Sequence, residues 1–138
     1  MYINCHTHFS YKYGTIAPED LLQQASQNGI DCLAITDINS TSACLDMLRR
    51  THRGGIRIAL GIDFRNSADQ LFVAIAQNNE GYHEINAYLS QFLTTETTII
   101  PPRAPLLKNA FVIYPFEKYT GFPLAANEFI GVRPEHLL

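Results

Sequence analysis

The segment His6-Thr7-His8 is the feature of this sequence best suited to chemistry. It lies at the end of a short segment predicted to be a strand, and side chains two positions apart on a strand point to the same face. Two imidazoles so placed can bind one divalent metal ion, at about 2.0–2.1 Å per bond for zinc. Because a lone His-x-His pattern is also common by chance, it is weak evidence for a metal site by itself.

Two acids strengthen this hypothesis. Asp37 ends the second predicted strand, and Asp63 nearly ends the third. In parallel α/β folds, functional groups gather at the C-terminal ends of the strands. Two nitrogen donors and up to four oxygen donors would suit zinc or manganese. Two other interpretations remain open, in which Asp37 caps a helix and Asp63 is a solvated strand end. The predicted metal ligands are His6, His8, Asp37 and Asp63.

The elements that must position these residues alternate between strand and helix. Apolar runs and helix-capping residues predict strands at residues 2–6, 30–36 and 56–64, with one helix from residue 18 to about 28 and another ending near residue 50. This order is typical of an α/β fold with mostly parallel strands and right-handed crossovers. Further on, the pattern predicts a strand at 71–76, a helix at 80–93, and short strands at 111–114 and 129–132.

Composition excludes several classes of protein. The 138 residues carry 10 Lys and Arg against 13 Asp and Glu, which argues against a generic polycationic nucleic-acid binder. No apolar run approaches the ~20 residues that span a bilayer, so no membrane association is expected. The three cysteines are too few and too widely spaced for a disulfide framework, and no basic leader precedes an apolar stretch. We therefore expect a cytoplasmic protein.

Five short motifs resemble the PHP family (polymerase and histidinol phosphatase), and most of all the N-terminal PHP domain of the alpha subunit of bacterial DNA polymerase III. The order and spacing of these motifs match the family over about residues 1–93, which we take as the PHP-like core. Residues 94–138 are expected to form a loop-rich C-terminal part of the same domain. The motifs are Cys5–Ser10, Pro18–Leu21, Leu33–Asp37, Gly61–Asp63 and Asn79–Tyr82.

The resemblance implies a distorted β/α barrel that binds up to three metal ions and, in active members, hydrolyses phosphoesters. His6 and His8 match the first two family ligands, and Asp63 replaces a bridging glutamate. Two other ligand positions have lost their donors, because the third family ligand falls at Tyr13 and the motif Thr-Asp-His ends here in Ile38. Neither His83 nor His136 matches a later ligand.

These departures predict a degenerate, mainly structural domain. The chain is too short for a complete barrel, so we expect a partial barrel from the N-terminal end of a replicative polymerase alpha subunit. That parent would be a nucleotidyltransferase, whereas this chain alone is expected to lack polymerase and phosphoesterase activity. At most a partial site for zinc or manganese would remain. The expected partners are the rest of the alpha subunit, the proofreading exonuclease subunit, DNA through the full-length protein alone, and a second copy of the fragment.

Two alternative functions stay open at this point. The first is a small PHP-family metal-dependent phosphoesterase. The second is a protein-interaction module whose contact surface is formed by Phe111–Phe116 and Phe122, although aromatic clusters of this kind are more often ordinary core.

Overall fold

The structure is a computed structural model that describes residues 2–51, 55–94 and 99–137. The chain divides into two compact units, Met1–Asp63 and Phe64–Leu138, which are described separately below. The sequence-based division into residues 1–93 and 94–138 stays a prediction, and residues 95–98 within it lie outside the described part of the chain.

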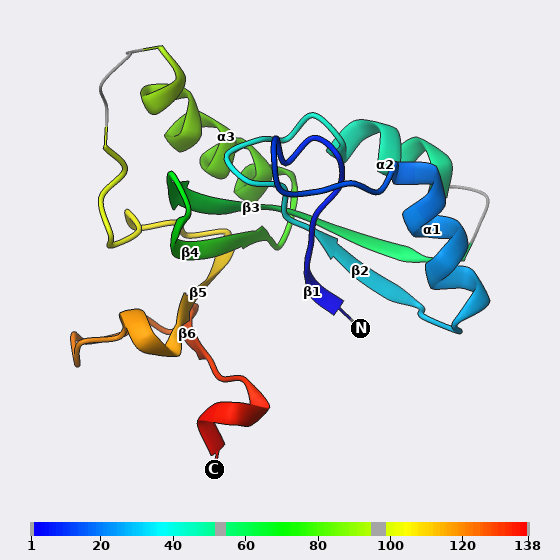
Figure 1. The fold of residues 1–138 in the computed structure, drawn as a ribbon. Helices are drawn as coiled ribbons and strands as arrows, with labels where there is room; N and C mark the ends of the chain where they lie inside the picture. The colour runs from blue at the N-terminus through cyan, green and yellow to red at the C-terminus, as the bar shows by residue number, and fades with distance from the viewer. Residues whose placement is uncertain (1, 52–54, 95–98, 138) are drawn as a thin grey trace. The chain divides into compact units, whose positions relative to one another are not determined.

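The first unit confirms the predicted alternation of strands and helices (Figure 1). Its strands pair in the order β1–β2–β3, and both pairings are parallel. The last of these strands is long enough to continue into the second unit. The elements are β1 (Tyr2–Cys5), α1 (Pro18–Gln27), β2 (Cys32–Ile35), α2 (Cys44–Thr51) and β3 (Arg57–Asn66).

Helix α1 begins and ends where its sequence predicts. Pro18 occupies its first turn with two acids, which suit the positive end of the helix dipole. The chain leaves the helix at Asn28, and Gly29 follows with a φ of 65°, a conformation that favours glycine. Figure 1 shows α1 and α2 side by side. The helices and β2 together bury a small apolar core formed by Ala25, Leu33, Ile35, Ala43 and Met47.

The second unit contains three strands of its own and one long helix. Strands β4 and β5 pair antiparallel, and β5 and β6 pair parallel. Three of the four strand pairings described above are therefore parallel, which confirms the predicted α/β class with mostly parallel strands. The elements are β4 (Asp69–Ala76), α3 (Asn79–Leu93), β5 (Ala110–Pro115), the 3₁₀ helix η1 (Phe116–Lys118), β6 (Glu128–Gly131) and the 3₁₀ helix η2 (Pro134–Leu137).

Helix α3 has the cap and the buried apolar face that its sequence predicted. The side chain of Asn78 caps the helix by accepting a hydrogen bond from the backbone N–H of Gly81 at 2.9 Å. The buried face of α3 includes Tyr88. The centroid of its ring lies 5.5 Å from that of Phe64 and 6.5 Å from that of Phe72. No helix in the described ranges, including α3 with its 15 residues, is long and apolar enough to cross a membrane.

Most of the aromatic segment considered above as a contact surface, Phe111–Phe116, lies on β5, and the two faces of this strand differ in exposure. Val112 and Tyr114 point into the core, where each is 1% exposed. Phe111, on the opposite face, is 42% exposed and meets the ring of Phe129 on β6, with centroids 5.8 Å apart. Phe122 packs instead against Tyr114, with ring centroids 5.0 Å apart. Part of this segment is thus ordinary core, as most aromatic clusters are.

Candidate functional site

The side chains of His6 and Asp63 meet inside the first unit. Nε2 of His6, one residue after β1, lies 3.0 Å from Oδ2 of Asp63 on β3. The Asp63 side chain is fully buried, and that of His6 is 11% exposed. The interpretation of Asp63 as a solvated strand end is therefore wrong. Nε2 of His6 is therefore already engaged by the carboxylate of Asp63.

Asp37 lies two residues after the end of β2 and is bound by a loop rather than by a helix. Its Oδ1 accepts hydrogen bonds from the backbone N–H of Thr7 and from Oγ of Ser10, each at 2.6 Å. Its Oδ2 accepts a third from Oγ1 of Thr7 at 2.7 Å. All three residues are buried. Because α2 begins only at Cys44, Asp37 does not cap it, and the helix-cap interpretation is wrong.

The loop that Asp37 binds is closed tightly on itself. The backbone N–H groups of Tyr13 and Gly14 both donate to the carbonyl oxygen of Ser10, at 2.9 and 2.8 Å. Gly14 lies so close to the backbone that a Cβ there would lie 1.8 Å from the carbonyl oxygen of Thr7. The carboxylate of Asp37 therefore holds a compact turn in place at the strand ends.

His8 occupies a different environment from His6. β1 ends at Cys5, so the strand periodicity that placed both histidines on one face does not extend to them. His8 is exposed, and its ring meets that of Phe9 with centroids 4.6 Å apart. Within the described residues, no three His, Cys, Asp or Glu side chains come together closely enough to hold a metal ion. The assignment of His6, His8, Asp37 and Asp63 to a partial metal site stays a prediction.

The two positions where the family's donors are missing have other contacts here. The Tyr13 ring is 57% exposed and meets the ring of His6 edge-on, with centroids 4.9 Å apart. The side chain of Ile38 has no lone pair to offer a metal ion. The backbone N–H of Ile38 donates to Oγ of Ser10 at 2.9 Å. Together with the three bonds on Asp37, these contacts mean that the residues present do not fit the multi-metal cluster that the family implies.

Cys5 is adjacent in sequence to His6, and a neighbouring imidazole can activate a thiol as a nucleophile. Burial raises the pKa of its thiol, which disfavours the reactive thiolate. The side chain packs at the margin of the apolar core of the first unit. Cys5 is therefore best explained as a packing residue.

Thr7 and Ser10 are the residues of this site that the sequence did not single out. Thr7 stands between the two histidines in sequence and is fully buried. A hydroxyl between two candidate ligands was a usable signal, since a buried hydroxyl needs a hydrogen-bond partner. The position of Ser10 depends on a loop fold that no periodicity predicts.

Comparison with known proteins decides the family. A model of the PHP domain matches residues 3–113, which is most of the chain. The chain belongs to the PHP family. It is 26% identical over 94 residues to the DNA polymerase III subunit alpha of Ureaplasma parvum, covering 68% of this chain and 10% of that protein. It is 20% identical over 110 residues to an error-prone DNA polymerase of Corynebacterium diphtheriae, covering 78% of this chain and 11% of that protein.

A solved structure supports the same fold. The chain resembles in fold a Bifidobacterium adolescentis protein provisionally assigned as a metal-dependent phosphoesterase, with a TM-score of 0.50 and 23% identity. The match covers 65% of this chain and 32% of that one. At this identity it shows the fold alone. The predicted PHP-type fold is confirmed. This PHP domain is homologous to domains of these polymerases, and the chain spans about a tenth of the length of the whole proteins.

Proposed function

We propose that this chain is a structural, non-catalytic PHP domain of the kind found in bacterial replicative polymerase alpha subunits. Its similarity to polymerase III alpha and error-prone polymerases supports the context of DNA replication. The phosphoesterase alternative rests on a likeness of fold, and fold does not determine function.

The observation that carries this proposal is the state of the acids at the strand ends. All three hydrogen bonds on the Asp37 side chain come from Thr7 and Ser10, in the loop after β1. The other acid, Asp63, is paired with His6. A metal cluster needs several deprotonated donors that converge on one point, and here each acid is already bound to protein groups.

The same proposal extends to partners and location. We place the domain in the cytoplasm, where it would contact the remainder of an alpha subunit and the proofreading exonuclease subunit. A second copy of the chain is a further possible partner, since an edge strand of a sheet can pair with another chain. Polymerase activity belongs to the larger proteins that this chain resembles.

The test is metal content combined with turnover. The purified chain is dialysed against buffer with and without zinc or manganese, analysed for bound metal, and assayed with a generic phosphodiester. We expect less than one tightly bound metal ion per chain and turnover no faster than buffer. Two or more bound ions, with turnover lost in His6→Ala, would establish the phosphoesterase alternative instead. Asp31→Ala, at an exposed acid, is the matched control.

A further inference from the structure

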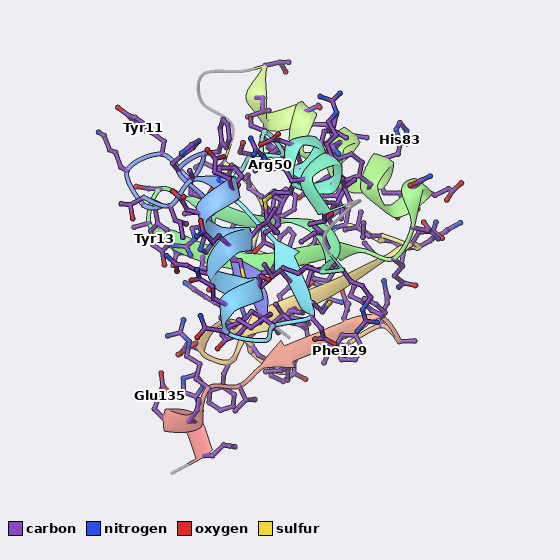
Figure 2. All side chains as sticks on the ribbon, turned by 90° about the vertical axis from the view of Figure 1, so that its right-hand side faces the viewer. Tyr11, Tyr13, Arg50, His83, Phe129 and Glu135 are labelled. Atoms are coloured by element: carbon purple, nitrogen blue, oxygen red, sulfur yellow. The ribbon has the colours of Figure 1, made fainter. Side chains whose placement is uncertain are left out.

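The loop of residues 8–13, called here the aromatic loop, exposes large rings to solvent. Phe9 is 41% exposed, Tyr11 is 84% exposed and Tyr13 is 57% exposed. Figure 2 shows the side chain of Tyr11 projecting from the molecule. Three exposed rings on one short loop form a local aromatic surface, and such surfaces can mark a binding site.

The aromatic loop is held rigidly from below. Ser10, at its centre, is fully buried and donates through Oγ to Asp37 at 2.6 Å. The same Oγ accepts from the backbone N–H of Ile38 at 2.9 Å, which joins the loop to the segment after β2. The rings on either side are therefore presented by a fixed backbone, and a preformed surface loses little entropy when it binds.

The charge around the aromatic loop favours an anionic ligand. Lys12 lies between two of the exposed tyrosines, with its Nζ 5.4 Å from the centroid of the Tyr11 ring. Residues 8–17 contain no acid, and neither do residues 38–43 of the adjoining segment. Asp37 is buried and engaged by three hydrogen bonds, and Asp63 is buried and paired with His6.

We propose that the aromatic loop binds single-stranded nucleic acid by stacking bases on Tyr11 and Tyr13. Stacking on exposed rings tolerates any sequence, and Lys12 supplies an attraction for the phosphates. The chain has a net charge of −3 and the loop carries one lysine. Affinity would therefore come from the rings rather than from many phosphate contacts. This inference goes beyond the structural role proposed above, and it revises the expectation that DNA is met through the full-length protein alone.

The experiment measures fluorescence anisotropy of a labelled thymidine oligonucleotide of about 20 nucleotides, titrated with the full chain at low salt in EDTA. EDTA removes any metal bridge between phosphate and the histidines, so the result does not depend on whether a metal site exists. We expect saturable binding that weakens about fivefold or more in Tyr11→Ala and in Tyr13→Ala. Tyr11→Phe keeps the ring and should bind like the wild type. Tyr2→Ala is the matched control, because Tyr2 is 58% exposed on β1.

Two further ligands separate stacking from attraction to phosphate. An abasic oligonucleotide of the same length and a duplex should both bind at least fivefold more weakly, because neither offers free base faces. Equal binding of the abasic strand would overturn the proposal, as would wild-type affinity in both alanine variants. Absence of binding to single strands would also overturn it, and would leave the aromatic loop as a surface for a protein partner.

Discussion

Each unit of the molecule contains a buried carboxylate that fixes loops. In the first unit, Asp37 is 1% exposed and accepts from Thr7 and Ser10. In the second unit, the Glu128 side chain is 7% exposed and accepts from Oη of Tyr114 at 3.0 Å and from the guanidinium of Arg103 at 2.8 Å.

The two carboxylates differ in what balances their charge. Glu128 has a cation beside it, and Arg103 also lies over the ring of Phe122, 4.1 Å from its centroid. The hydrogen bonds to Asp37 come from neutral groups, two hydroxyls and one backbone N–H. Of the two, only Asp37 was predicted as a metal ligand, yet it accepts hydrogen bonds that fix the fold as Glu128 does. Position at a strand end therefore does not by itself make an acid a ligand.

The largest expected effect is that of removing Asp37. Asp37→Ala leaves three buried donors without their acceptor, so we expect a loss of about 3–5 kcal/mol in the free energy of unfolding, measured by urea denaturation. Asp31→Ala should change it by less than about 0.5 kcal/mol, because both side chains of the Asp31–Arg57 pair are largely exposed. A loss below about 1 kcal/mol for Asp37→Ala would show that the loop does not depend on this carboxylate.

The second unit should respond to alkali. Burial raises the pKa of Tyr114 to about 12, outweighing the hydrogen bond from the backbone N–H of Ala104, and Glu128 raises it further. An unfolded tyrosine ionises near 10, so between about pH 10 and 12 the unfolded chain has lost a proton that the folded chain keeps. Stability therefore falls as pH rises through this window, by roughly 2–3 kcal/mol. Tyr114→Phe should abolish this part of the pH dependence, and an unchanged slope in that variant would contradict the assignment.

The hydroxyl of Thr7 can be removed without its backbone N–H. Thr7→Val removes the hydroxyl that donates to Oδ2 of Asp37 and accepts from the backbone N–H of Phe9 at 3.2 Å, but keeps the backbone N–H that donates to Oδ1. We expect a loss of about 1–2 kcal/mol in urea denaturation, since a hydrogen bond to a charged group is worth more than a neutral one. Thr7→Ser retains the hydroxyl and should lose clearly less. Equal losses in the two variants would point to packing rather than to the hydrogen bond.

The smallest effect concerns a half-buried carboxylate of the second unit. The backbone N–H and the side-chain amide of Asn109 donate to Glu84 and lower the pKa of its carboxyl. The unfolded chain binds this proton more readily, so the contribution of Glu84 is present at neutral pH and is lost as pH falls below about 4. Glu84→Gln should flatten the acid limb of the stability curve by less than about 1 kcal/mol. A larger change would mean that this half-buried pair stabilises the fold as much as the buried ones.

The elements were largely predictable because their signals are local. The proline that starts α1, the glycine that follows it and the cap at Asn78 each act within one helical turn. Apolar runs placed the strands for the same reason. The side-chain contacts were not predictable, because Thr7 and Ser10 reach Asp37 across 30 and 27 residues of sequence.

The candidate site illustrates this limit. His6 and Asp63 were predicted to face one rim, and the structure brings them to hydrogen-bonding distance. Asp37 was placed correctly at the end of its strand, but its partners decide what its carboxylate does. Glu128 was not predicted from the sequence, since a lone acid near a short strand belongs to no recognisable motif.

The most direct test of the structural role is the dependence of folding on metal. The free energy of unfolding of the wild-type chain is measured in EDTA and with manganese or zinc, beside His6→Ala. A metal ion held by the folded state adds about 2.7 kcal/mol when present at 100 times its dissociation constant. We expect no gain in the wild type and a loss of stability in His6→Ala that is the same with and without metal. A gain of that size in the wild type, absent from His6→Ala, would contradict the account and restore these strand ends as a metal centre.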